Sequence, residues 1–173
     1  MEDDPLLERV RKSAFRFLSI RARSRKELWA KLKEKGFDSH VVNRVLDYLL
    51  ERGYLDDASF AGQWARNLAV NRLLGNRRIE MSLREKGIPA ELIGAAIAGA
   101  REEISEREAI GRLIAKKERG RKVTDPKELR RLGRRLAGRG FPPCLVFEIL
   151  ETAGEACLEL KGEESLRNND ESC

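Results

Sequence analysis

One pattern of apolar and polar positions occurs three times along the chain, and each copy is centred on a glycine: Gly36, Gly87 and Gly140. Leucine or isoleucine stands eight and four residues before each glycine, and lysine or arginine immediately precedes it. Apolar residues follow at the first, fifth, sixth, ninth and tenth positions after it. The copies lie 51 and 53 residues apart, a period typical of tandem repeat proteins.

Within each copy the pattern predicts two helices joined by a tight turn. Apolar residues four apart share one face of a helix before the glycine, and the later positions share a face of a second helix. Glycine suits the turn because it adopts the left-handed conformation that ends a helix without a Cβ clash. Helical patterning upstream of each pair predicts a further helix over residues 7–20, 57–73 and 103–117, with Phe15 on the apolar stripe of the first.

These helices predict an all-α protein of three tandem three-helix repeats that resemble helix-turn-helix units. We expect the repeats to span residues 5–53, 54–100 and 101–153 and to form an elongated, curved array. A charged fraction of 37% and an aromatic fraction of 6% favour an array over a single large globule. The acidic segment 154–173 has few large apolar residues, so we expect a disordered tail.

Helix starts carry capping residues. Ser24 followed by Glu27 predicts a capping box, and Asp125 with Pro126 forms a similar opening in the third repeat.

Asp56 and Asp57 are the candidate pair for a magnesium site, but helix capping explains them better. Asp56 is placed as an N-cap between Leu55 and Phe60, which form a hydrophobic staple, and both carboxylates complement the helix dipole. We therefore predict no metal site.

Other chemistry is missing from the sequence. It holds no phosphate-binding glycine loop, zinc-protease motif or nucleophile elbow. His40 is the only histidine, and Cys144, Cys157 and Cys173 form no CxxC pair. We expect neither an enzyme nor a cofactor. Without a long apolar segment or a basic signal region, we expect a soluble, cytoplasmic protein that does not enter membranes.

Positive charge is concentrated in the first and third repeats. Residues 5–53 carry 13 basic and 6 acidic groups, residues 54–100 carry 6 and 5, and residues 101–141 carry 14 and 7. Such clusters suit phosphate contact because arginine forks bind the anion and release condensed counterions. A solvated face with ion pairs within each helix remains the alternative. The candidate contact residues are Arg21, Arg23, Arg25, Lys26, Arg130, Arg131, Arg134 and Arg135.

These cations stand on the first and second helices of their repeats, whereas a helix-turn-helix unit reads duplex bases with its third helix. The third helix of the last repeat presents Glu148 and Glu151 instead. The distribution favours sequence-independent contact with a nucleic-acid backbone or a nucleoprotein surface.

A further set of residues resembles the RecX family, whose members regulate the RecA recombinase. The resemblance spans residues 9–153, most specifically Arg21, Arg23, Ser24, Glu27, Leu28, Leu32, Lys35 and Gly36, then Gly53 to Asp57 with Phe60 and Ala61, then Gly75, Arg78 and Lys86 to Ile88. It implies a non-enzymatic protein that binds the RecA filament on single-stranded DNA and damps the ATPase, strand-exchange and coprotease activities of RecA. Tyr54 and Asp57 match its hallmark and join the candidate contact residues.

Several alternatives stay open at this point. The chain could be a stand-alone DNA-binding regulator of tandem helix-turn-helix units, a helical adaptor for other proteins or, most remotely, a nuclease. Free single- or double-stranded DNA, bound without sequence preference, is a second candidate partner. We expect a monomer.

Overall fold

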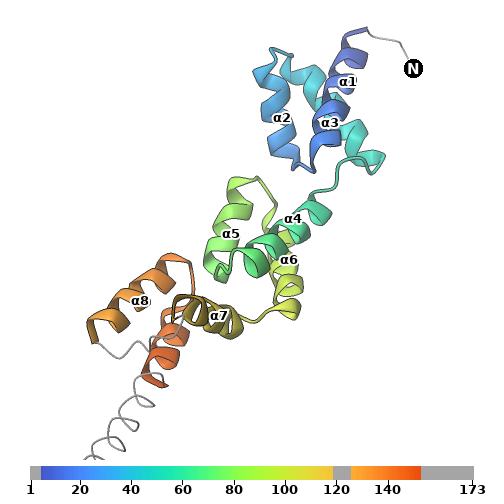
Figure 1. Ribbon diagram of the computed structural model, residues 1–173. Helices are drawn as coiled ribbons and strands as arrows, with labels where there is room; N and C mark the ends of the chain where they lie inside the picture. The colour runs from blue at the N-terminus through green and yellow to red at the C-terminus, as the bar shows by residue number, and fades with distance from the viewer. Residues whose placement is uncertain (1–4, 119–125, 153–173) are drawn as a thin grey trace, which may run out of the picture.

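The computed structural model describes residues 5–118 and 126–152, and these residues form helices and turns without a strand. The helices fall into three groups that follow one another along the molecule (Figure 1). The first group holds α1 (Pro5–Ile20), α2 (Arg25–Glu34) and α3 (Ser39–Glu51). The second holds α4 (Asp57–Arg66), the π-helical turn η1 (Asn67–Asn71), α5 (Asn76–Glu85) and α6 (Ala90–Glu103). The third holds α7 (Glu106–Glu118), α8 (Pro126–Gly138) and a helix over residues 143–152.

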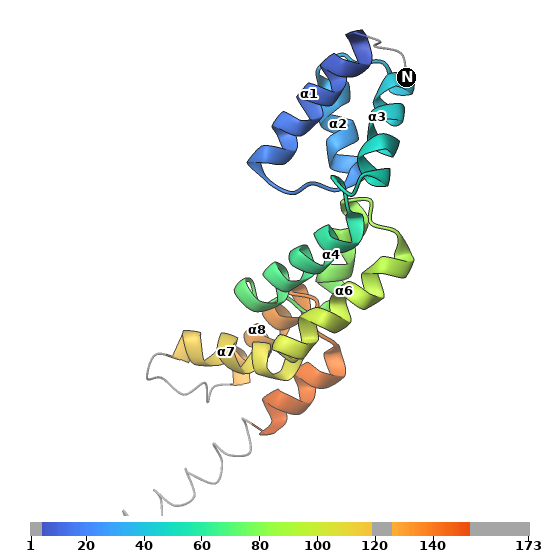
Figure 2. The same cartoon turned by 90° about the vertical axis from the view of Figure 1, so that its right-hand side faces the viewer.

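Both views show an elongated arrangement, with the first and third groups at opposite ends and the second between them (Figures 1 and 2). The all-α, repeated architecture is as predicted. The expected tail at 154–173 lies outside the described residues, and so does Asp125.

The three repeated glycines end their helices as predicted. Gly36, Gly87 and Gly140 have φ of +83°, +77° and +87°, in the left-handed region. After α2, the Gly36 N–H donates to the Lys33 carbonyl at 2.9 Å and the Phe37 N–H donates to the Leu32 carbonyl at 3.4 Å. The same pair of bonds recurs at the other two glycines. Each turn is therefore a Schellman motif, which satisfies carbonyls left unpaired at the helix end.

Two hydrophobic cores hold the groups together. The first group buries its own cluster, which includes Leu28, Leu32 and Leu46. The second and third groups share one continuous cluster that runs from Phe60 to Val146. The leucines and isoleucines predicted before each glycine are all buried in these two clusters. The third group is therefore packed onto the second through apolar contact, whereas the first group has a separate core.

Two helix boundaries differ from the sequence-based expectation. The helix expected over residues 57–73 leaves α-helical geometry at Asn67 and continues as η1. The helix expected from residue 103 begins at Glu106, because Ile104 is extended and Ser105 forms a reciprocal capping box with Glu108. The Ser105 N–H donates to Glu108 Oε2 at 2.8 Å, and the Glu108 N–H donates to Ser105 Oγ at 3.1 Å.

The predicted box at Ser24 is only half formed. Ser24 Oγ accepts the Glu27 N–H at 3.2 Å, but the Glu27 carboxylate is bound to Arg21 and Lys86 instead of returning to Ser24. Asp56 caps α4 as predicted, since its Oδ1 accepts the N–H groups of Ala58 at 2.9 Å and Ser59 at 3.0 Å.

Candidate partner and nucleic-acid interface

The first joint lies between the first and second groups, where the start of α2 meets the turn after α5. Ser24 Oγ donates to the Lys86 carbonyl at 2.7 Å. The Arg25 N–H donates to Asp57 Oδ1 at 2.8 Å, and Lys26 Nζ donates to the Glu85 carbonyl at 3.2 Å. Asp57, the first residue of α4, therefore caps a helix of the preceding group.

Glu27 is the electrostatic centre of the first joint. Its carboxylate accepts from Arg21 Nη1 at 2.9 Å and pairs with the Lys86 ammonium, which also lies 4.9 Å from the centre of the Trp64 ring. Burial raises the pKa of Glu27, but the hydrogen bonds from Arg21 and Lys86 outweigh it, so the pKa lies below its ordinary value. Burial dominates at Asp57, whose pKa is raised although the Arg25 N–H bond lowers it.

The second joint, between the second and third groups, repeats this plan with different residues. The Gly75 N–H donates to the Arg139 carbonyl at 3.0 Å, and the Asn76 N–H donates to Glu106 Oε1 at 2.8 Å. Arg139 Nη1 reaches the Arg72 carbonyl at 2.7 Å. In both joints, the basic residue before the repeated glycine of the later group, Lys86 or Arg139, contacts the earlier group. The first helical residue of the later group, Asp57 or Glu106, caps the second helix of the earlier group.

The predicted contact residues of the first repeat are held by the joint or by their own group. Arg21 pairs with Glu27, and Lys26 reaches across the joint. Arg25 pairs with Asp47 at 2.8 Å. Arg23 donates to the Phe17 carbonyl at 3.2 Å and lies over the Phe17 ring. All four side chains already serve the architecture of the array, which sequence alone did not reveal.

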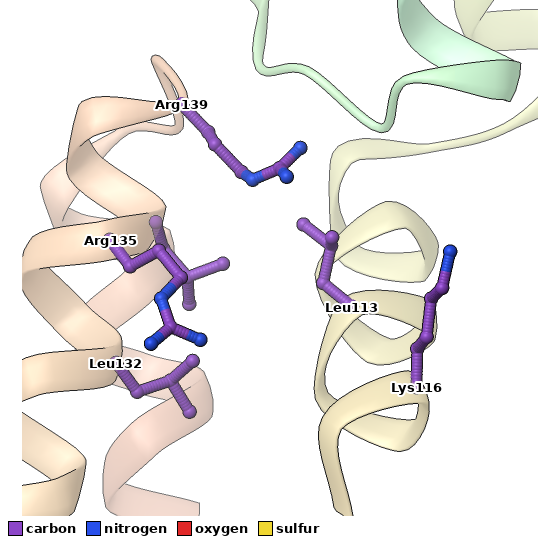
Figure 3. A pocket seen from close by; sticks show the side chains of 6 residues that line it. Leu113, Lys116, Leu132, Arg135 and Arg139 are labelled. Atoms are coloured by element: carbon purple, nitrogen blue, oxygen red, sulfur yellow. The ribbon is translucent and has the colours of Figure 1, made fainter.

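The predicted contact residues of the third repeat lie exposed on α8: Arg130, Arg131, Arg134 and Arg135. One of them, Arg135, also lines a cavity of about 180 Å³ between α7 and α8. Lys116 and Arg139 add positive charge to this cavity, and Leu113, Leu132 and Leu136 form its apolar lining. Figure 3 shows Arg135 and Leu132 facing the gap from α8, with Leu113 opposite on α7 and Arg139 above.

The sequence alone does not indicate this cavity, which we call the α7–α8 cavity. Lys116 and Arg139 are 23 residues apart and line one cavity only because α7 and α8 face each other across it. Within the described residues, Arg135 has no carboxylate partner. Because Arg139 already donates to the Arg72 carbonyl, Arg135 is the guanidinium of this lining best able to bind an anion such as a phosphate through two hydrogen bonds.

Tyr54 is exposed, as a contact residue should be, and its neighbour was not expected. Its ring meets Phe15 edge to face, with centroids 5.0 Å apart. Phe15 was expected on the buried stripe of α1, but 37% of it is exposed. The reason is that Val10 and Ala14 occupy the fully buried positions of α1.

Other candidate chemistry stays dispersed across the described part of the chain. No three or more histidine, cysteine, aspartate or glutamate side chains gather there in a group that could hold a metal ion. His40 and Cys144 are exposed. Among the helices of residues 5–118 and 126–152, none has the length and apolar content needed to cross a bilayer.

Solved structures with similar folds support the architecture. The crystal structure of RecX from Lactobacillus salivarius matches with a TM-score of 0.74 and 18% identity, covering 86% of this chain and 97% of that chain. A second structure, described as a crystal structure of regulatory protein RecX, matches with a TM-score of 0.73 and 24% identity, covering 85% of this chain and 72% of that chain. At these identities the comparison establishes the fold.

Proteins related in sequence identify the family as well as the fold. Residues 11–49 match the family model of the first three-helix domain of RecX, and residues 56–97 match that of the second. Regulatory protein RecX of Mycobacterium sp. (strain JLS) is 37% identical over 154 residues, covering 86% of this chain and 84% of the relative. Regulatory protein RecX of Mycolicibacterium smegmatis is 35% identical over 148 residues, covering 83% and 78%. The chain belongs to the RecX family of regulatory proteins.

Proposed function

We propose that this chain regulates RecA by binding the RecA filament on single-stranded DNA and damping its ATPase, strand-exchange and coprotease activities. The observation that carries the proposal is family membership over most of the chain, at 37% identity to a regulatory protein RecX. The motif residues of the first two repeats support it, because they build the first joint: Ser24, Glu27, Asp57 and Lys86.

The elongated shape supports a clamp that spans several filament subunits. A linear array makes several weak contacts at once, and each added contact raises the avidity without requiring a tight individual site. The two joints set the spacing between successive helix groups. We propose that the protein acts as a monomer and without catalysis of its own, because a bound array restrains the filament by occupancy alone.

Electrostatic contact is assigned to α8 and the α7–α8 cavity. Arg135 is exposed and faces the gap from α8 (Figure 3), so a phosphate at this position would meet its guanidinium, with Lys116 of α7 adding positive charge to the lining. The candidate cations of the first repeat are committed to the first joint and to contacts within their own group. We therefore propose that the third group makes the main contact with the nucleic-acid backbone. The charge distribution along the sequence suggested instead that the first and third repeats contribute equally.

The test is a titration of the DNA-dependent ATPase of RecA with this protein, up to saturating concentrations. Wild-type protein should lower the ATPase rate. Arg135→Ala should need about tenfold more protein for the same effect, since a lost charge-assisted hydrogen bond costs about 1.5 kcal/mol. The slope of log affinity against log salt should also fall by about 0.7 for one lost single-strand phosphate contact.

Arg77→Ala is the matched control, because it removes an exposed arginine from α5, away from the cavity. It should behave like the wild type in both measurements. An unchanged RecA ATPase at saturating wild-type protein would refute the proposed function. Sequence-specific binding to one duplex, lost on a scrambled duplex, would favour a stand-alone DNA-binding regulator instead.

A further inference from the structure

Two exposed aromatic rings meet where α1 passes the end of α3. Phe15 is 37% exposed and Tyr54 is 57% exposed, although large apolar side chains are usually buried. Their centroids are 5.0 Å apart and their planes are inclined by 83°. This edge-to-face pair is outside the buried core of the first group, so packing of the fold does not account for its exposure.

Two arginines and a second tyrosine extend this pair. The guanidinium carbon of Arg11 lies 5.2 Å from the centre of the Tyr48 ring, and that of Arg52 lies 5.5 Å from it. Arg11 stands one helical turn before Phe15 on α1, and Tyr48 of α3 stands one turn before Arg52, the C-cap residue of that helix. Cations and rings are therefore interleaved along one surface, which we call the aromatic face: Arg11, Phe15, Tyr48, Arg52 and Tyr54.

We propose that the aromatic face binds the bases of single-stranded nucleic acid. Exposed aromatic rings stack on unpaired bases of any sequence, and neighbouring guanidinium groups attract the phosphates between those bases. A duplex would fit less well because its bases already stack on one another and present only their edges. The aromatic face thus has both components of a single-strand binding surface.

Local charge supports a polyanionic ligand at this face. Among the residues that the structure describes, the one acidic group paired with its arginines is Glu8, which meets Arg11 at 2.5 Å in a partly exposed ion pair. Exposed ion pairs contribute little to stability, so a phosphate can replace this carboxylate. The surrounding segment, residues 5–53, carries 13 basic against 6 acidic groups.

This site goes beyond the proposed function, because it requires neither RecA nor the α7–α8 cavity. It also gives the first group a contact surface that does not depend on Arg21, Arg23, Arg25 or Lys26.

The test measures binding to a labelled oligothymidylate of about 15 nucleotides, long enough for one such site, by fluorescence anisotropy without RecA. Phe15→Ala combined with Tyr54→Ala should raise the Kd about tenfold. An abasic strand of the same length keeps the phosphates but has no bases to stack. The wild type should bind the abasic strand more weakly than oligothymidylate. The double substitution should not weaken binding to the abasic strand any further.

Phe147→Ala is the matched control, because Phe147 is 64% exposed on the helix over residues 143–152, in the third group. Its Kd for oligothymidylate should equal that of the wild type. Tyr54→Trp keeps an aromatic ring at the site and should retain binding, with tryptophan fluorescence quenched when a base stacks on it. This variant tests the site independently, should the double substitution impair folding.

Four outcomes would overturn the proposal. An unchanged Kd in the double variant, or equal losses on the oligothymidylate and abasic strands, would show that no base is bound. Unaltered fluorescence of the Tyr54→Trp protein at saturating oligothymidylate would show the same. Loss of RecA-filament binding with unchanged oligothymidylate binding would assign the aromatic face to protein docking. Because the DNA assay contains no RecA, failure of this site leaves the proposed function open to its own test.

Discussion

At the scale of single residues, Glu27 shows how a predicted capping residue can serve a different bond. Its carboxylate joins Arg21 of its own group to Lys86 of the next. Ser24 meanwhile uses its hydroxyl twice, as acceptor for the Glu27 N–H and as donor to the Lys86 carbonyl. The Ser24 and Glu27 side chains, which would form a capping box within one helix, thus connect two helix groups, and Glu27 reaches Lys86, 59 positions later in the chain.

The lowered pKa of Glu27 makes the first joint dependent on pH. A carboxylate whose pKa falls on folding contributes stability above its ordinary value of 4.5, and this stability is lost as the pH drops through the lower folded value. Glu27→Gln should therefore reduce the free energy of unfolding near neutral pH by up to about 1 kcal/mol, with a smaller difference in acid. Urea unfolding at several pH values measures it.

Glu34→Gln is a suitable control, since Glu34 pairs only with Lys31 on the exposed surface of its own helix within the described residues. It should leave the pH profile almost unchanged. A Glu27→Gln protein with the wild-type stability at every pH would contradict the assigned role.

At the scale of elements, the three repeated turns have one backbone conformation but different surroundings. A Cβ on Gly36 would meet nothing within 4 Å. A Cβ on Gly140 would lie 2.5 Å from the Arg78 backbone nitrogen, at the start of α5. The same glycine therefore ends a helix in every group, but in the second joint it also permits close approach of two backbones.

Comparing Gly36→Ala with Gly140→Ala separates these two roles. Gly36→Ala should cost about 1–2 kcal/mol, the cost of a left-handed alanine. Gly140→Ala should cost more, because α5 must also move away from the turn. Thermal unfolding of both variants measures the difference. Equal destabilisation would mean that α5 can move away from the Gly140 turn without loss of stability.

At the scale of the whole molecule, the two joints differ in what lies beneath them. The second joint sits over the core shared by the second and third groups, whereas the first connects separate cores through hydrogen bonds and ion pairs. The first group should therefore move relative to the second more readily than the third group does.

Salt should reveal this difference. Raising the ionic strength from about 0.1 M to about 1 M shortens the Debye length from about 10 Å to about 3 Å and weakens the ion pairs of Glu27. Hydrogen exchange of the Arg25 amide, bonded to Asp57, should accelerate. Exchange of the Gly75 amide, bonded to the neutral Arg139 carbonyl, should change little. Equal acceleration at both amides would contradict a looser first joint.

Sequence predicted the fold better than the site because the two depend on different ranges of interaction. The buried Leu28 and Leu32 were identified from their spacing alone, and the α8 arginines, which were predicted as contact residues, are exposed. Arg25 was also predicted as a contact residue, and its side chain pairs with Asp47. The helical pattern also placed Phe15 in the core. The carboxylate that pairs with Arg25 lies on another helix, which helical periodicity cannot identify, and Phe15 is exposed because Val10 and Ala14 fill the buried positions of α1.

By itself, the sequence determined the helices, the turns between them and the threefold repetition, because helical periodicity and the left-handed preference of glycine act over a few residues. Only the tertiary structure decided which cations hold the array together and which face outward. It also decided that Lys116 and Arg139 share a cavity and that Phe15 and Tyr54 form a pair. These outcomes depend on how successive groups pack, and that packing sets the burial and charge of residues far apart in the chain.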